Sequence, residues 1–496
     1  MIALTAADVA AATGGVLHPA GLDPTTMVTG AVVIDSRQVE PGSLFVALPG
    51  ERVDGHDYAA TAVGAGAALV LAARPVEAPD GSGALPSVVV PDVEKALGDL
   101  AREVLLRLRE AALEPGGSRL RVIGVTGSVG KTTTKDLLAQ VCGTVGPTVA
   151  PVLSFNNEIG LPLTVLRADE QTRFLVLEMG ASGPGHLTYL TDIAPPDVAV
   201  VLVVGSAHLG PFGGIEGVAR AKAEIVQGLA PGGVAVLNAD DPRVAAMAAV
   251  APGEVVLFGS EPEADVRAAD IRLDRAGRAA FTLVTRAGIG GDAGGAEEWP
   301  VALRLVGEHH VHNAVAAAAA ALCVGLAPRD VAAALSVADA LSPHRMHVVD
   351  RPDGVTVVDD SYNANPDSVR AALRALAVLA GRDRRSVAVL GEMMDLGPDA
   401  RAAHEGIGLQ VVRLNIGLTV VVGAGARGIA DGALREGSWG EEVATVDDVD
   451  AAAAFLADEL RPGDVVLVKS SKDAGLWRLG DLLVGAGQAD GQVVAP

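Results

Sequence analysis

The chain has 496 residues, of which 50% are hydrophobic and 20% charged, and its formal net charge is −23 at pH 7. This length exceeds what one hydrophobic core supports, so two to four domains are expected, and we predict three. The acidic balance argues against a nucleic-acid partner, because such binding needs clustered lysine and arginine. Both cysteines, Cys142 and Cys323, lie in apolar stretches, and we predict thiols in a reducing compartment.

The first residues, MIALTAADVAAATGG, have neither a basic start nor a long apolar core. We therefore predict a helix capped by Thr5, with Asp8 three residues later, and no signal peptide. The longest uncharged apolar run, residues 314–327, is shorter than the ~20 residues that span a bilayer. A cytoplasmic protein without membrane insertion is expected.

Residues 1–112 are predicted to form a small N-terminal α/β domain. Short apolar runs (AVVI, LFVAL, AALVLA and SVVV) alternate there with helical segments. The last segment has apolar side chains at helical spacing, namely Leu97, Leu100, Val104, Leu105 and Leu108. The segment EPGGSR at 114–119 is typical of a linker to the next domain.

Residues 120–340 are predicted to form a central domain around a parallel sheet like that of P-loop ATPases. The strands RVIGV, RFLVLEMG and DVAVVLVV are almost continuously apolar, as in sheets buried on both faces. Residues 255–306 alternate apolar and polar around turns such as DRAGR, which predicts an antiparallel appendage. An alanine-rich helix is expected at about 313–325, and the glycine-rich residues 288–296 are expected to form a flexible loop.

Residues 342–496 are predicted to form a C-terminal Rossmann-like domain. Its strands are VTVVDD, SVAVLG, LTVVVG and VVLVKS, with helices between them. Asn365 followed by Pro366 is a good cap and first turn for a helix that buries Val369, Leu373 and Leu376.

The segment GVTGSVGKTTTKD, residues 124–136, follows the first central strand and precedes a helix. Backbone N–H groups and the helix dipole then surround one anion, Lys131 adds a positive charge, and the Thr132 hydroxyl can bind magnesium. The spacing G-x-x-G-x-x-G-K-T is a variant of the usual phosphate loop. The predicted nucleotide-binding residues are Thr126, Gly127, Ser128, Val129, Gly130, Lys131, Thr132 and Thr133.

Glu178 ends the strand FLVLE, and His208 follows the strand VAVVLVV. Both are expected at the carboxyl edge of the parallel sheet, where ligands of such sheets bind. Each residue alone is about as suited to capping or hydrogen bonding as to binding a metal. Their shared edge favours a magnesium site, because Mg²⁺ bound to a nucleotide needs few protein ligands.

Eight ordered motifs resemble the Mur ligase family, and they extend over nearly the whole chain: DSRQVEPGSLFVALPGERVDGHDY, GVTGSVGKTTTKD, SFNNEIGLPLT, LEMGASGPGHL, AHLGPFGGIEGVARAKAEI, DDSYNANPDSVRAAL, LGEMMDLG and LVKSSKDAGL. The resemblance implies ATP-driven amide bond formation through an acyl phosphate. Within the family, the member that the motifs resemble most implies UDP-N-acetylmuramoyl-tripeptide and D-alanyl-D-alanine as substrates. The alternative is a family member that adds lysine or diaminopimelate to UDP-N-acetylmuramoyl-dipeptide. The absence of an Asp-Asn-Pro-Arg tetrapeptide disfavours that alternative.

A monomer is expected. The resemblance also implies roles for individual residues. The implied catalytic residues are Lys131, Glu178, His208 and Lys222. Two magnesium ions are expected, with metal ligands at Thr132, Glu178, His208 and Lys222, the last as a carbamate. Further ATP contacts are expected at Asn313, Arg345 and Asp360. The N-terminal domain is implied to bind UDP through Ser36 and Arg37, and the muramoyl-peptide is implied to contact Asn156 and Asn157.

The sequence departs from the family pattern at His310, where asparagine is usual, and at Ser470 and Lys472, where glycine and arginine are common. The run HHVH could also suggest zinc, but caps or surface groups are the commoner use of such histidines. Gly423, Gly425 and Gly428 form a G-x-G-x-x-G pattern, which would suggest a dehydrogenase. Because a nucleotide loop already exists at 124, we interpret these glycines as packing residues. A guanine-specific switch would need Asn-Lys-x-Asp, which is missing from the sequence.

Overall fold

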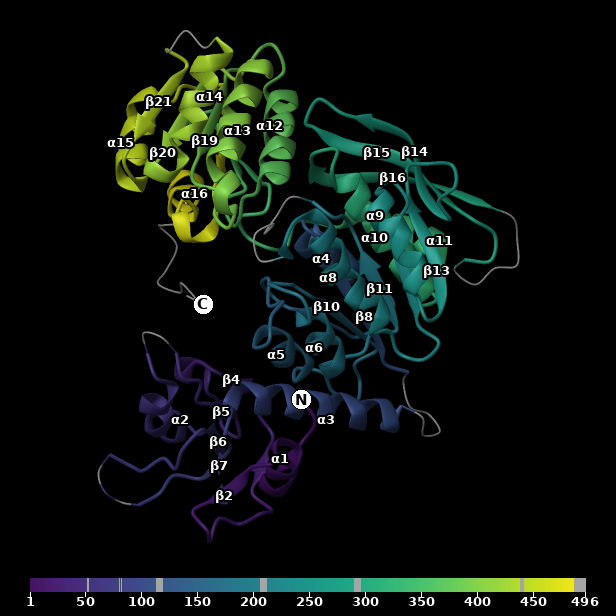
Figure 1. The fold of residues 1–496 in the computed structure, drawn as a ribbon, viewed down its shortest axis with the longest axis vertical. Coiled ribbons are helices and arrows are strands. Elements are labelled where there is room, and N and C mark those ends of the chain that lie inside the picture. The colour runs from purple at the N-terminus through teal and green to yellow at the C-terminus, as the bar shows by residue number, and fades with distance from the viewer. Residues whose placement is uncertain are drawn as a thin grey trace.

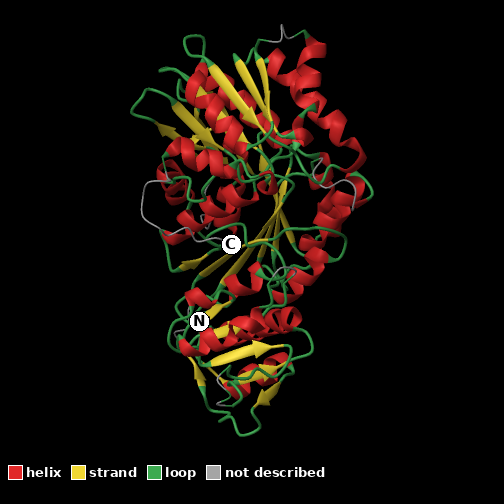
Figure 2. Ribbon diagram, turned by 90° about the vertical axis from the view of Figure 1, so that its left-hand side faces the viewer, coloured by secondary structure: helices red, strands yellow, loops and turns green. Residues whose placement is uncertain are grey.

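The computed structural model describes residues 1–50, 53–79, 81, 83–112, 119–205, 212–289, 296–437 and 441–485. Three α/β units follow one another along the long axis, with the N-terminal unit at one end and helices flanking each sheet (Figure 1, Figure 2). Most of the predicted linker at 114–119 and of the loop at 288–296 lies outside the described residues, as does His208. Within the described part, no helix is long and apolar enough to cross a bilayer.

The N-terminal unit contains a five-stranded sheet in the order β2-β7-β6-β5-β4, in which only β2 is antiparallel to its neighbour. A two-stranded antiparallel sheet joins β1 to β3. The four predicted strands and the long closing helix are all present. The elements are β1 (Leu4–Thr5), α1 (Ala6–Thr13), β2 (Val16–His18), β3 (Met27–Val28), β4 (Val32–Val33), β5 (Leu44–Val46), α2 (Ala59–Gly64), β6 (Leu69–Ala72), β7 (Ser87–Val89) and α3 (Val93–Ala111).

Helix α3 joins the N-terminal unit to the central one, because its apolar face packs into a core that both units share. The five apolar residues predicted for this face are all buried. At its polar side, Arg102 donates to the Asp192 carbonyl (2.8 Å) and Arg109 donates to the Pro195 carbonyl (2.7 Å). Figure 1 shows α3 crossing beneath α5 and α6 of the central unit. The two units are therefore packed together through a continuous apolar contact.

The predicted cap of α1 is present. Thr5 Oγ1 accepts a hydrogen bond from the Asp8 amide (3.0 Å), and Asp8 accepts one from the Thr5 amide (2.8 Å). Replacing Thr5 with alanine is expected to lower the free energy of unfolding by about 1 kcal/mol, because the Asp8 amide loses its acceptor and the Asp8 carboxylate loses the Thr5 hydroxyl. Urea denaturation measures this change. Thr61→Ala, at an exposed position inside α2, is the control and should leave stability unchanged.

The central unit contains a nine-stranded sheet in the order β16-β15-β14-β13-β12-β11-β8-β10-β9. Its strands are β8 (Arg121–Thr126), β9 (Thr148–Val149), β10 (Phe174–Glu178), β11 (Val198–Val201), β12 (Val234–Asn238), β13 (Glu254–Gly259), β14 (Val266–Leu273), β15 (Arg278–Thr285) and β16 (Glu297–Val306). The antiparallel appendage is narrower than predicted, because β13 pairs in parallel with both β12 and β14. Only β14, β15 and β16 pair with one another in antiparallel fashion.

Helices cover both faces of this sheet: α4 (Lys131–Gly143), α5 (Gly160–Val165), α6 (His186–Ile193), α8 (Ile215–Gln227), α9 (Pro242–Ala245), α10 (His310–Cys323) and α11 (Pro328–Val337). The alanine-rich helix α10 begins three residues earlier than predicted. Every alanine from 316 to 321 is completely buried, and this helix packs against α4 in the same core as β8 and β11. Small side chains let α10 approach its neighbours closely, so its apolar run is a core helix.

The C-terminal unit has a six-stranded sheet in the order β17-β18-β22-β19-β20-β21, parallel except for β17 at one edge. The strands are β17 (His347–Asp350), β18 (Thr356–Asp359), β19 (Ser386–Leu390), β20 (Leu418–Val422), β21 (Val443–Val446) and β22 (Val465–Lys469). Helices α12 (Pro366–Ala380), α13 (Ala400–Arg413) and α14 (Gly428–Glu436) cover one face, and α15 (Val449–Glu459) and α16 (Trp477–Val484) cover the other. Asn365 caps α12 as predicted.

The glycines of the G-x-G-x-x-G pattern allow close packing after β20. Gly423 has a φ of 86°, a left-handed conformation that side chains disfavour. A Cβ on Gly425 would lie 2.1 Å from the Glu392 carboxylate, and one on Gly428 would lie 2.9 Å from His404. These contacts agree with the interpretation of the glycines as packing residues.

Candidate active site

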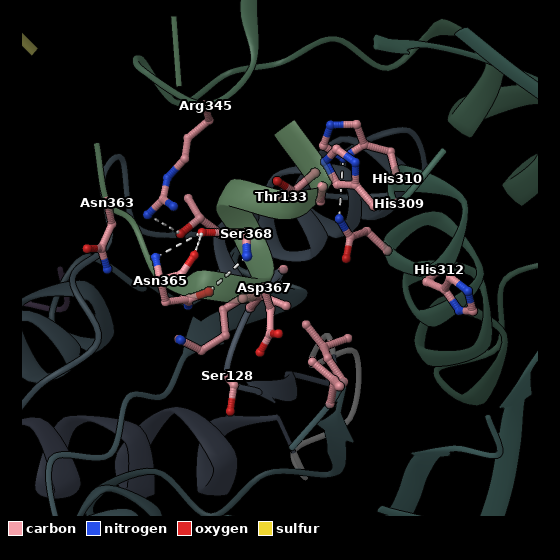
Figure 3. A pocket seen from close by; sticks show the side chains of 18 of the residues that line it. Ser128, Thr133, His309, His310, His312, Arg345, Asn363, Asn365, Asp367 and Ser368 are labelled. Atoms are coloured by element: carbon pink, nitrogen blue, oxygen red, sulfur yellow. Dashed lines mark hydrogen bonds between the residues drawn. The ribbon is translucent and has the colours of Figure 1, made fainter. Parts of the chain in front are cut away.

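A cavity with a volume of about 690 Å³ lies between the central and C-terminal units. Eleven of the predicted site residues line it: Ser128, Val129, Gly130, Lys131, Thr132, Thr133, Asn156, Glu178, Asn313, Arg345 and Asp360. In Figure 3, Arg345 lies on one side of the pocket and His309 and His310 lie on the other. The cavity thus brings together side chains that are more than 200 residues apart in the sequence.

The phosphate loop connects β8 to the N-terminus of α4, as predicted. Gly130 begins the helix with a φ of 85°, and a Cβ there would lie only 2.4 Å from Asn313 Oδ1. The Lys131 ammonium donates to the Gly127 carbonyl (2.8 Å), so its side chain folds back over the loop. Burial lowers the pKa of Lys131, while the Glu178 carboxylate acts in the opposite direction. The loop has the geometry of an anion site with a lysine at its edge.

Replacing Gly130 with alanine is expected to weaken nucleotide binding at least ~10-fold, because the new methyl group meets Asn313 and the backbone is strained. Isothermal titration with Mg·ATP measures the affinity. The matched control is Gly143→Ala at the other end of α4, where a Cβ meets no atom within 4 Å. Equal affinities for the two variants would contradict the prediction.

Glu178 meets the phosphate loop at the carboxyl edge of the sheet. Thr132 Oγ1 donates to Glu178 Oε2 (2.9 Å), and Asn156 Nδ2 donates to Glu178 Oε1 (2.7 Å). The Glu178 side chain is buried, with 1% of its surface exposed. Ser154 joins this group, because its hydroxyl lies 2.9 Å from Thr132 Oγ1. Hydroxyl and carboxylate oxygens placed together in this way suit a Mg²⁺ ion.

Lys222 lies on α8, which packs against β8 and β11. Its side chain is buried, and no hydrogen bond or ion pair joins its ammonium to another residue of the described part. Burial, together with the Lys131 ammonium, lowers the pKa of Lys222 to about 7. A large part of this amine is therefore neutral at neutral pH and can act as a nucleophile.

Arg345 reaches the phosphate loop from the segment that enters the C-terminal unit. Its guanidinium lies 3.3 Å from Thr132 Oγ1 and 3.2 Å from Ser154 Oγ. The same guanidinium lies over the Tyr362 ring, 4.2 Å from its centroid, which is a cation–π contact. Arg345 thus adds positive charge next to the residues that would bind phosphate.

Asp360 forms a buried ion pair at the other wall of the cavity. Lys469 Nζ donates to Asp360 Oδ2 (2.5 Å) and to the Asn363 carbonyl (2.9 Å). Burial lowers the pKa of Lys469, and Asp360 opposes that effect. Because Lys469 ends β22 and Asp360 follows β18, the pair is formed by neighbouring parallel strands.

The histidines near the start of α10 have different surroundings. His309 and His310 lie against each other, with ring centroids 4.1 Å apart, whereas the exposed His312 lies 3.5 Å from Asp240. Burial lowers the pKa of His309 to about 4 and that of His310 well below its usual value. Neutral His310 accepts a hydrogen bond at Nδ1 from Asn313 Nδ2 (3.3 Å), so the departure at His310 keeps a polar contact with Asn313.

Several predicted residues do not line the cavity. Thr126 is buried at the end of β8, and Gly127 contributes its carbonyl to Lys131. Asn157 Oδ1 accepts from the Gly160 amide (2.9 Å), three residues along the chain at the start of α5. Lys222 is buried on α8 and does not line the cavity.

Ser36 and Arg37 lie in the N-terminal unit, away from the cavity. Arg37 is exposed and its guanidinium binds the Asp35 carboxylate, with the shortest distance 2.7 Å. The Asp35 contact holds the arginine at the surface, where it is accessible to an anionic ligand.

Three further residues line the cavity, although the sequence did not predict them as site residues: Ser154, Tyr362 and Lys469. Ser154 and Tyr362 stand in loops beside predicted residues, without a pattern of their own. Lys469 carried a usable signal, because it is a charged residue that ends an otherwise apolar buried strand.

Comparisons with known proteins support a single family. Residues 125–321 match the Mur ligase middle domain, residues 344–472 match the Mur ligase glutamate ligase domain, and residues 29–104 match the Mur ligase catalytic domain. A relative from Mycobacterium tuberculosis, UDP-N-acetylmuramoyl-tripeptide--D-alanyl-D-alanine ligase, is 48% identical over 98% of each chain.

Solved structures agree over the same length. The crystal structure of MurF from Acinetobacter baumannii has a TM-score of 0.83 at 30% identity and covers 98% of this chain and 99% of its own. A MurF ligase from Thermotoga maritima in complex with ADP has a TM-score of 0.73 at 29% identity and covers 92% of this chain and 98% of its own. The sequence motifs, the three-unit fold and these matches together establish that the chain belongs to the Mur ligase family.

Proposed function

We propose that this protein joins D-alanyl-D-alanine to UDP-N-acetylmuramoyl-tripeptide at the expense of ATP. The name of its relative from Mycobacterium tuberculosis gives the two substrates for that protein, and the similar MurF ligase from Thermotoga maritima was solved in complex with ADP. The observation that carries this proposal is the convergence of Lys131, Thr132, Glu178 and Arg345 in one cavity between two units. A phosphate loop faces a second cationic side chain there, which is the arrangement that phosphoryl transfer requires.

The reaction has two steps. A carboxylate oxygen of the tripeptide attacks the γ-phosphorus of ATP, the bond to ADP breaks, and an acyl phosphate forms. The dipeptide amine then attacks the acyl carbon, phosphate leaves, and the amine loses a proton. Lys131 and Arg345 neutralise phosphate charge, and the cavity between the two units shields the acyl phosphate from water.

Thr132 and Glu178 are proposed to hold magnesium, because their oxygens lie 2.9 Å apart beside the phosphate loop. His208 is proposed as a further ligand from its motif alone, since it lies outside the described residues. When bound, magnesium would neutralise charge on the transferred phosphate. Lys222 fits the proposed carbamate, because a buried amine with a pKa of about 7 reacts readily with carbon dioxide. Two ions are proposed.

On the substrate side, Ser36 and Arg37 are proposed to bind the UDP group. Asn156 is proposed to contact the muramoyl-peptide, and its bond to Glu178 supports this because it holds the Asn156 side chain beside the phosphate loop. The proposed contact of Asn157 would use its amide nitrogen, since its Oδ1 is occupied. Asn313 and Asp360 are proposed ATP contacts.

We propose a monomer that acts in the cytoplasm, where its nucleotide substrates are made available. We also propose domain limits of 1–112, 120–340 and 342–496, which the separate five-, nine- and six-stranded sheets support.

The proposal is tested by measuring phosphate release from ATP. UDP-N-acetylmuramoyl-dipeptide and UDP-N-acetylmuramoyl-tripeptide, the latter ending in lysine or in diaminopimelate, are each offered D-alanyl-D-alanine, lysine or diaminopimelate. Turnover is expected only with a tripeptide and D-alanyl-D-alanine together, and mass spectrometry should detect the pentapeptide product. Turnover of the dipeptide with lysine or diaminopimelate would overturn the proposal in favour of the third-residue ligase.

A further inference from the structure

A turn at residues 342–346 joins the central unit to the C-terminal unit and carries Arg345 into the cavity. On its central side, the Ser342 amide donates to Asp136 Oδ2 on α4 (3.1 Å). On its C-terminal side, the Met346 amide donates to Asp360 Oδ1 (3.2 Å). Both His344 and Met346 have left-handed backbone conformations, with φ values of 57° and 51°. Such conformations are unfavourable for these residues and persist only where other contacts hold them.

The side chain of His344 holds the middle of this turn through contacts with two carboxylates. Its Nδ1 lies 2.6 Å from Asp359 Oδ2 at the end of β18, and its Nε2 lies 3.7 Å from Asp481 Oδ1 on α16. The other oxygen of Asp359 accepts from the Ser361 amide (3.1 Å) and hydroxyl (2.5 Å). The imidazole is therefore fixed by a buried carboxylate that is itself immobilised.

The backbone carbonyl of His344 also positions Tyr362, whose ring contacts the Arg345 guanidinium. The Tyr362 amide donates to the His344 carbonyl (3.2 Å), and the Arg345 guanidinium lies over the Tyr362 ring. His344 and Arg345 are adjacent but make their contacts in opposite directions. His344 contacts the C-terminal sheet edge, whereas Arg345 contacts Thr132 and Ser154 of the central unit.

We propose that His344 is a positioning residue that acts through Arg345: its cationic ring, held between Asp359 and Asp481, fixes the turn from which Arg345 meets the nucleotide phosphates. This inference rests on the proposed role of Arg345 in binding ATP. A carboxylate at each ring nitrogen favours the doubly protonated form.

The charged groups that face the ring are Asp359 from β18, Asp481 from α16 and Arg345 from the turn itself, with the Trp477 ring at its edge. The hydrogen bond to Asp359 raises the pKa of His344 above its ordinary value, and the attraction of both carboxylates exceeds the repulsion by Arg345. The cation is thus present below this raised pKa and is lost as the pH increases through it. ATP affinity should fall over that same interval.

The test is a double-mutant cycle of His344→Gln and Arg345→Ala, read out as equilibrium binding of Mg·ATP and as KM for ATP. His344→Gln should weaken ATP binding about tenfold without changing KM for the UDP substrate, whose proposed contacts (Ser36, Arg37, Asn156 and Asn157) do not include Arg345 or its turn. The double variant should be no weaker than Arg345→Ala alone, because the two residues act as one unit. His347→Gln, at an exposed position three residues along the chain, is the matched control and should bind ATP normally.

Additive losses in the cycle would overturn the inference, and so would unchanged ATP binding by a folded His344→Gln variant. If that variant fails to fold, Asp481→Asn takes its place, because it removes only the more exposed of the two carboxylates. Asp481→Asn must then weaken ATP binding and flatten the pH dependence of that binding. Nucleotide binding needs no acceptor, so the cycle still decides this inference if the wild-type protein shows no ligase turnover. An absence of ligase turnover would contradict only the proposed function.

Discussion

Replacing Lys222 with alanine is expected to reduce kcat by ~10²–10³-fold or more, because the proposed carbamate, whose negative charge would help to hold magnesium, cannot form. Lys222→Arg should be equally inactive, and added bicarbonate should not restore it, since a guanidinium does not form a carbamate. Acetate should restore part of the activity of Lys222→Ala by supplying a carboxylate. Phosphate release with both substrates present measures these effects.

The pH dependence offers a second readout for Lys222. Only the neutral amine reacts with carbon dioxide, so carbamate formation should fall as the pH decreases below the pKa of about 7. Activity at limiting carbon dioxide should decrease over the same interval and recover when bicarbonate is raised. Lys95→Ala, on the exposed side of α3, is the control and should keep full activity. An active Lys222→Ala variant would exclude the carbamate role.

Replacing Glu178 with glutamine should cause a loss of similar size, ~10²–10³-fold in kcat. The amide keeps the shape of the side chain and can still accept from Thr132, but it removes the negative charge proposed to bind magnesium. The concentration of Mg²⁺ needed for half-maximal activity should therefore rise. The assay is phosphate release over a Mg²⁺ titration, with melting temperature as a check on folding.

Glu170→Gln is the matched control, because Glu170 is exposed in the turn before β10. It removes the same charge from the same unit and should leave the magnesium dependence unchanged. If Glu178→Gln needed no more magnesium than the wild-type protein, the metal role of Glu178 would be wrong, and its contacts with Thr132 and Asn156 would be purely structural.

Local sequence determined most elements of the fold. Apolar runs of four to six residues predicted the parallel strands, because strands buried on both faces need apolar side chains at every position. Caps at Thr5 and Asn365 were also predictable, since they satisfy amides only a few residues away. The edge strands β17 and β21 were missed, because edge strands are short and only partly buried. The extent of the antiparallel appendage depended on β13, whose direction is set by its neighbours.

The phosphate loop is the part of the site that the sequence alone determined. Its glycines, Lys131 and Thr132 lie within one short segment, so strand, turn and helix are sufficient to arrange them. Spacing also placed Glu178 at the correct edge, because parallel strands end on the same side of a sheet.

Only the tertiary structure decided how the C-terminal unit completes the site. Arg345 meets Thr132 and Ser154 across more than 190 residues, and Lys469 meets Asp360 across two strands that are distant in sequence. Likewise, a lysine on an amphipathic helix is usually solvated, and only packing of α8 against the sheet buries Lys222 and lowers its pKa. Local patterns encode backbone conformation, whereas burial and long-range charge contacts depend on which surfaces the folded chain brings together.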